Sequence, residues 1–138
     1  MKPTNAFQKL FASVINAFVA IVVTLPLFYL WGLGLKWKLA VIVAFFIYEM
    51  IFLLRKDRRD LGMIVGKTFW KTPFSDSQYI FYNILYTLSF STLFFNIIFP
   101  FDLLLINLLL IQLPLVVLTK TTLHGYLSGM MTLDSISR

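Results

Sequence analysis

The sequence contains no cysteine, a single histidine and few charged residues, and each scarcity excludes a class of protein. Without cysteine the chain cannot form a disulfide, a thiolate metal site or a cysteine nucleophile. No second histidine or close carboxylate group accompanies His124 at metal-ligand spacing, so we predict no metal and no cofactor. No catalytic constellation is visible either, and we therefore predict that the protein is not an enzyme.

What the chain has in abundance is apolar and aromatic side chains. Of its 138 residues 59% are hydrophobic and 17% aromatic, whereas only 13% are charged. A water-soluble domain of this length could not bury so much apolar surface, and the long apolar runs lack the charged face of an amphipathic surface helix. The composition predicts a protein whose solvent is largely lipid.

The apolar runs have the lengths expected of membrane-spanning helices. The first, 10–31, is roughly 22 residues long, enough to cross a hydrocarbon core of about 30 Å. A second run, 37–54, follows a break at Gly32 and Gly34. The apolar segment after Gln78 is too long for one helix, and a turn around Pro100 divides it into 79–98 and 103–118. We predict one domain, an all-α integral membrane four-helix bundle.

The basic residues predict the orientation of this bundle. If both termini and the polar loop 55–78 face the cytoplasm, ten of the twelve Lys and Arg residues lie there, and only Lys36 and Lys38 lie outside. A basic cluster directly after the second run is expected to contact anionic lipid headgroups rather than nucleic acid. The members of this cluster are Arg55, Lys56, Arg58 and Arg59.

A few strongly polar side chains interrupt the apolar runs near their predicted cytoplasmic ends. We predict that they form a single layer, to which the helices contribute Asn16, Glu49, Asn83 and Gln112. One interpretation is structural, because amide and carboxyl groups can hydrogen-bond between helices. The other is functional: Glu49 binds a proton, a cation or a polar substrate group, with Asn16 as its amide partner.

Small residues recur at every fourth position around Asn16, at Ala12 and Ala20. Such a stripe lets another helix approach closely, so we expect a packing interface, either within the chain or with a partner. Because short spans can hardly enclose a pathway alone, we also expect a homo-oligomer or a complex with other membrane subunits.

Three stretches resemble the RDD family of bacterial multi-span membrane proteins. In Phe7–Asn16, Lys9 and Asn16 stand where the family has an arginine and an aspartate. Asp60–Gly62 is similar to the family's Thr-Leu-Gly at the start of the inner loop, and Leu123–Met131, with His124 and Gly129, is similar to its Leu-His-Asp ending.

This resemblance implies a multi-pass protein of the bacterial cytoplasmic membrane, in a family for which transport, including cation/proton exchange, has been proposed. The acidic family positions are replaced at Asn16 and Gly125, which leaves Glu49 as the only expected carboxylate at membrane depth. We therefore expect a small transporter-like unit or an accessory subunit. A holin-like pore-forming protein or a purely structural assembly factor are the alternatives.

Overall fold

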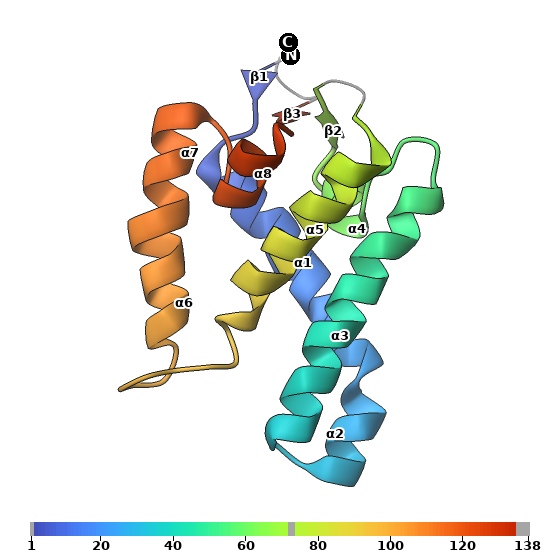
Figure 1. The fold of residues 1–138 in the computed structure, drawn as a ribbon, viewed down its shortest axis with the longest axis vertical. Helices are drawn as coiled ribbons and strands as arrows, with labels where there is room; N and C mark the ends of the chain where they lie inside the picture. Colours follow the sequence, from blue (N-terminus) through green and yellow to red (C-terminus); the bar gives the residue numbers. More distant parts are fainter. Residues whose placement is uncertain (1, 72–73, 135–138) are drawn as a thin grey trace.

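A computed structural model describes residues 2–71 and 74–134 of the chain (Figure 1). Three of its helical segments are long and apolar enough to cross a membrane: Ala6–Val23, Leu35–Leu54 and Asp102–Thr119. These segments correspond to the first, second and fourth predicted spans.

The first predicted span is built as two helices, α1 (Ala6–Val23) and α2 (Leu25–Trp31). Helix α1 starts with a capping box, in which Asn5 and Gln8 exchange side-chain and backbone hydrogen bonds. At the junction the Thr24 hydroxyl donates to the carbonyl of Ala20 at 2.9 Å, and Pro26 stands in the first turn of α2. Proline is well suited to a helix start, so the break falls at this point.

Helix α3 (Leu35–Ile51) runs back along α1 and continues into a 3₁₀ turn, η1 (Phe52–Leu54). Trp37 ties the two helices together, because its indole N–H donates to the carbonyl of Thr24 at 3.2 Å. The chain reverses between α2 and α3 at Gly32, whose φ of 69° favours glycine.

The loop predicted for 55–78 contains a short helix, α4 (Leu61–Val65), and a strand, β2 (Thr68–Trp70). This strand joins β1 (Lys2–Pro3) and β3 (Thr132–Asp134) in an antiparallel sheet of order β1-β3-β2. Pro3 and Phe69 both pair with Leu133. The sheet therefore brings the two ends of the described chain and the central loop to the same end of the molecule (Figure 1).

The third apolar helix differs from its predicted bounds. Helix α5 comprises Asp76–Ser91, so it begins three residues before the predicted span 79–98 and ends seven residues before its end. At its end the hydroxyls of Ser91 and Thr92 donate to carbonyls three residues earlier, at 2.6 Å each. Such local bonds compete with helix continuation, and apolarity alone does not reveal them.

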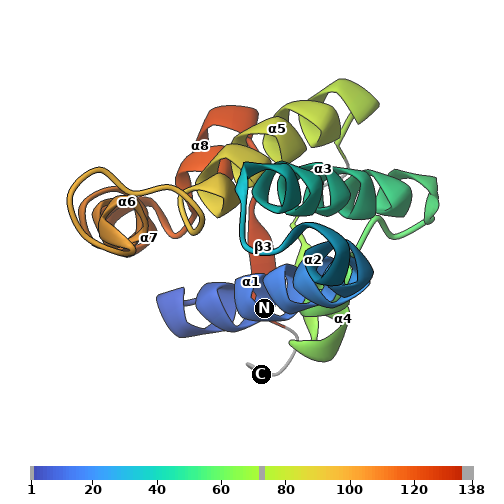
Figure 2. The same ribbon diagram turned by 90° about the horizontal axis from the view of Figure 1, so that it is seen from below.

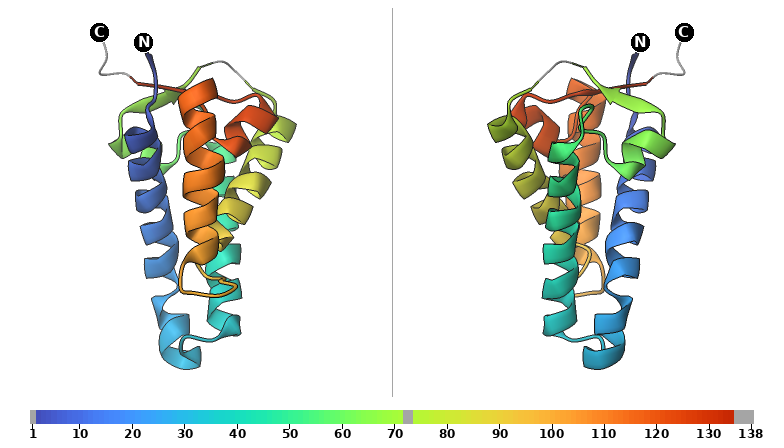
Figure 3. Two further views of the ribbon diagram at one scale, coloured as in Figure 1. Left: turned by 90° about the vertical axis from the view of Figure 1, so that its left-hand side faces the viewer. Right: turned by 90° about the vertical axis from the view of Figure 1, so that its right-hand side faces the viewer.

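The next segments form a fourth helical rod with a π-helical middle. They are α6 (Asp102–Ile106), η2 (Asn107–Gln112) and α7 (Leu113–Thr119). A short helix, α8 (Leu123–Ser128), then packs against α5. Figure 2 shows the rod apart from α3, and in the side views of Figure 3 it runs alongside α1.

The apolar core lies between α1, α3 and α5. Its buried members are Ala20, Trp37, Val41, Phe45, Tyr86 and Phe90. Phe45 stacks on Phe90 with ring centroids 4.1 Å apart and meets Tyr86 edge to face. This aromatic packing holds α3 against α5 and so fixes the helix that carries Glu49.

Candidate functional site

The most unusual feature of the structure is a pair of buried carboxyl groups, Glu49 and Asp60. Their exposed fractions are 1% and 5%. The two carboxyl groups lie close enough to interact electrostatically, and Asn16 is a further neighbour of Asp60. Two buried carboxyl groups this close repel each other when both are charged, so the arrangement favours a proton on one of them.

Asp60 is positioned by its place at the start of α4. As the N-cap residue of this helix, it accepts a hydrogen bond from the backbone N–H of Met63 at 2.8 Å. Helix α4 in turn packs directly on α1, because Gly62 leaves no room for a side chain: a Cβ there would overlap the carbonyl oxygen of Ala12. The missing side chain of Gly62 is thus what lets Asp60 reach the pair.

Asn16 connects the carboxyl pair to three helices. Its Oδ1 accepts hydrogen bonds from the hydroxyl of Tyr48 at 2.9 Å and from the backbone N–H of Gly62 at 3.0 Å. Its Nδ2 donates to the hydroxyl of Tyr86 at 3.2 Å. None of these hydrogen bonds reaches Glu49, so the pairing of Asn16 with Glu49 stays a prediction.

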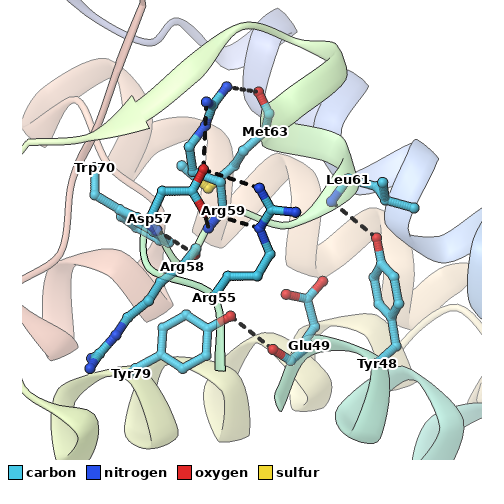
Figure 4. A network of polar contacts seen from close by, with 10 residues as sticks. All are labelled: Tyr48, Glu49, Arg55, Asp57, Arg58, Arg59, Leu61, Met63, Trp70 and Tyr79. Atoms are coloured by element: carbon cyan, nitrogen blue, oxygen red, sulfur yellow. Dashed lines mark hydrogen bonds and ion pairs between the residues drawn. The ribbon is translucent and has the colours of Figure 1, made fainter. Parts of the chain in front are cut away.

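No basic side chain neutralises the pair in the part of the chain that the structure describes. The ion pairs seen there use other carboxylates, such as Asp57 with Arg55 at 3.0 Å and Asp76 with Arg58 at 2.6 Å. In Figure 4 Glu49 lies with Tyr48 and Tyr79, and no dashed line joins its carboxyl group to an arginine. One of its oxygens, Oε1, has no hydrogen-bond partner, and burial raises the pKa of Asp60 above its ordinary value.

The basic cluster has more internal contacts than predicted. Arg59 lies over the ring of Phe69, 3.8 Å from its centroid, and the Arg58 backbone carbonyl accepts a hydrogen bond from Trp70 Nε1 at 2.9 Å. The Arg58 and Arg59 side chains are only 27% and 15% exposed. These two arginines contact the loop around Asp60, and headgroup binding by Arg55, Lys56, Arg58 and Arg59 stays a prediction.

The side chains of the predicted polar layer fall into two groups on different sides of α5, and their common depth in a membrane stays a prediction. Asn83 lies near the carboxyl pair, where its Nδ2 donates to the sulfur of Met50 at 3.4 Å and its Oδ1 has no partner. Gln112 belongs elsewhere. Its Nε2 donates to Asn107 Oδ1 at 3.1 Å, and Asn107 donates to Ser89 Oγ at 2.7 Å.

The π-helical turn explains why Gln112 joins the second group. In a regular α-helix, residues five apart point in different directions, whereas the wider η2 turn brings Asn107 and Gln112 to the same side, facing Ser89. Helical spacing could therefore not place Gln112.

The residues that carry the RDD resemblance gather at the sheet end of the molecule. Lys9 donates to the hydroxyls of Thr4 at 2.6 Å and Thr132 at 3.0 Å. His124 stacks on Tyr86 with ring centroids 4.7 Å apart, and burial lowers the pKa of His124 to about 3, with nearby Lys9 adding to the effect. Gly129 ends α8 with a φ of 74°.

Comparisons with family models, curated proteins and solved structures find no match for this chain. The site is therefore interpreted from its own geometry.

The small-residue stripe on α1 is used within the chain. Ala20 is 1% exposed in the core between α1, α3 and α5, and Ala12 lies against Gly62 of α4. The stripe is therefore an internal packing interface, which corrects the alternative that it contacts a partner.

Sequence reasoning found Glu49 and Asn16 but missed Asp60 as a member of the site. Asp60 follows a run of charged residues and looked like part of a solvated loop. The available signal was local: an aspartate three residues before Met63, followed by the Leu-Gly pair, is typical of a helix start. That this short helix would pack on α1 was not visible in the sequence.

Proposed function

We propose that the protein is a small, multi-pass, transporter-like membrane unit that binds a proton at Glu49 and Asp60. The observation that carries this proposal is the burial of two neighbouring carboxyl groups, with no basic partner among residues 2–71 and 74–134, near the end of a helix long enough to cross a membrane. Intramembrane carboxyl groups are costly, and their usual roles are in ion and proton pathways.

The chemistry of the pair supports reversible proton binding. A carboxyl pair that shares a proton resists the loss of that proton, because a second buried negative charge is unfavourable. Asn16 and Tyr48 hydrogen-bond around the pair without adding charge. Protonation or release would therefore change the net charge at a buried place where α1, α3 and α4 meet.

The proposal includes the orientation and the family expected from the sequence. Four spans, with α5 as the third, would place the sheet end in the bacterial cytoplasm. The clustering of Lys9, Asn16, Gly62, His124 and Gly129 at that end supports an RDD-like protein, since residues of separate motifs come together in space.

A proton flux assay tests the function. The full chain would be reconstituted in liposomes that contain a pH-sensitive dye, and proton entry would be followed after a pH step with different external cations. We expect Glu49→Gln and Asp60→Asn to reduce the flux at least tenfold, because each amide keeps the shape but cannot exchange a proton. Asp57→Asn, at a side chain that is 40% exposed, is the matched control and should leave the flux unchanged.

The same assay separates the proposal from its alternatives. Flux that Glu49→Gln leaves intact would refute a role for the pair and favour an accessory or assembly subunit. Unselective release of the dye itself, from wild type and variants alike, would indicate a holin-like pore instead.

A further inference from the structure

A small cavity with several polar residues on its wall adjoins the carboxyl pair at the sheet end of the molecule. Its volume is about 40 Å³. Asp60 and Asn16 line one part of it, and Lys9 and Thr132 line another. The first two residues are buried, whereas the other two are half-buried. The cavity therefore extends from the neighbourhood of the pair towards the molecular surface near the sheet.

One face of α1 runs along this cavity. The residues that line it are Lys9, Ala12, Ser13 and Asn16, at the spacing of side chains that share a helix face. Because Lys9 and Asn16 are seven residues apart, the cavity follows the helix for about 10 Å. Polar side chains recur over this whole distance, although the helix as a whole is apolar enough to cross a membrane.

Polar groups on the cavity wall have hydrogen-bonding capacity left. The Lys9 ammonium donates to the hydroxyls of Thr4 and Thr132, which uses two of its three N–H groups. Tyr82 also lines the cavity, and its hydroxyl makes no hydrogen bond to any residue that the structure describes. Polar groups that keep such capacity inside a protein are the usual partners of internal water.

The size of the cavity suits water. One water molecule needs about 10–15 Å³ of such space, so a cavity of this volume has room for about three. A hydrogen-bonded step between oxygens covers about 2.8 Å. Waters together with the hydroxyls of Ser13 and Tyr82 can therefore span the length of the cavity. A chain of this kind passes protons, because each oxygen accepts one proton while it releases another.

We propose that this cavity takes up water and is the route by which the carboxyl pair exchanges its proton with the sheet end of the molecule. A proton that leaves Asp60 passes to the nearest water, and the far end of the chain releases one to solution beside Thr132. Tyr82 and Lys9 are positioning residues that hold the water by hydrogen bonds. The Lys9 ammonium can also give its proton to the chain and regain one from solution, so its charge does not block the passage. This inference rests on the proposed function, since it requires a proton at the pair.

Exchange of the carboxyl proton for deuterium tests the route and does not depend on transport. The full chain in lipid bilayers would be moved from H₂O to D₂O, and infrared spectroscopy would follow the shift of the C=O band of the protonated carboxyl group. Glu49→Gln and Asp60→Asn assign this band to the pair. We expect Tyr82→Phe to slow the shift about fivefold, the effect of losing one hydrogen bond. Tyr126→Phe is the matched control, because this side chain is 57% exposed and does not line the cavity.

A reagent that blocks the cavity gives a second test on the folded protein. Because the chain contains no cysteine, a thiol reagent reacts only with an introduced one. Thr132→Cys places a thiol at the half-buried end of the cavity, and benzyl methanethiosulfonate attached there should slow the exchange at least about tenfold, relative to the same protein before modification. Leu133→Cys is the matched control, since adjacent side chains of a strand point to opposite faces and Leu133 does not line the cavity.

The possible failures can be told apart. Exchange that neither Tyr82→Phe nor the modified Thr132→Cys protein slows would overturn the route and leave the proposed function standing. Lys9→Met should slow the exchange as well, and faster exchange would overturn the part assigned to Lys9, because it would mean that the ammonium only repels protons. A wild-type spectrum without a C=O band from Glu49 or Asp60 would refute the proposed function, and this inference with it.

Discussion

Gly62 is the position where one added methyl group should have the largest effect on the site. A Cβ at this residue would lie 2.8 Å from the carbonyl carbon and 2.9 Å from the Cα of Ala12, besides overlapping its carbonyl oxygen. These are backbone atoms of α1, which cannot rotate out of the way as a flexible side chain can. We therefore expect Gly62→Ala to push α4 away from α1.

The expected cost has two parts. Overpacking of this kind typically costs about 1–3 kcal/mol. Moving α4 also weakens the hydrogen bond from the Gly62 N–H to Asn16, worth about 1 kcal/mol. The sum, about 2–4 kcal/mol, corresponds to a fall in the melting temperature on the order of 10 °C. Because Asp60 moves with α4, proton flux should fall as well.

Thermal unfolding in detergent, followed by tryptophan fluorescence, measures this effect. Gly34→Ala is the matched control, since a Cβ there meets no atom within 4 Å and the backbone is extended. Its effect should stay below about 1 kcal/mol. Equal melting temperatures for the two variants would refute the close approach of α4 and α1, and with it our account of how Asp60 reaches Glu49.

Two further predictions concern other parts of the fold. The Asp102 carboxylate accepts hydrogen bonds from the backbone N–H groups of Ile97 and Ile98 at 2.9 and 2.6 Å. Asp102→Ala should therefore speed hydrogen exchange in the turn before α6 and lower the free energy of unfolding by at least about 2 kcal/mol. Unchanged exchange at both isoleucines would contradict this. His124 should lower the free energy of unfolding as the pH falls from about 6.5 to about 3, its lowered pKa in the folded chain. In this range the imidazole is protonated in the unfolded chain but not in the folded one. The loss is about 1.4 kcal/mol per pH unit, and melting curves of His124→Phe should lack it. The raised pKa of Asp60 has the opposite effect, because it favours the folded state at low pH. This contribution is the same in wild type and in His124→Phe, so it cancels when their melting curves are compared.

The sequence was sufficient to predict the helices whose apolar runs are bounded by clear breaks. The bounds of α3, Leu35–Ile51, and of the rod that ends at Thr119 lie within a few residues of the predicted spans. The end of α5 was predicted wrongly because residues 92–101 are as apolar as the helix before them. Their turn is stabilised by the Asp102 carboxylate, which no hydropathy pattern reveals.

The candidate site was predictable only in part, for a related reason. Glu49 and Asn16 stood out because a polar side chain in an apolar run needs a partner. Asp60 and Tyr48 did not, since each looked ordinary in its own surroundings and acquires its role only when α4 folds onto α1. Contacts between segments far apart in the sequence carry the site, and local patterns do not specify them.

The order of strands in the small sheet has a consequence for biogenesis. The central strand, β3, follows every helix in the chain, while its two neighbours, β1 and β2, are synthesised before α5. Neither neighbour can pair within the sheet until the ribosome has delivered the strand that lies between them. Closure of this sheet is thus a late step, which can occur only after all the helices of the described chain have been synthesised.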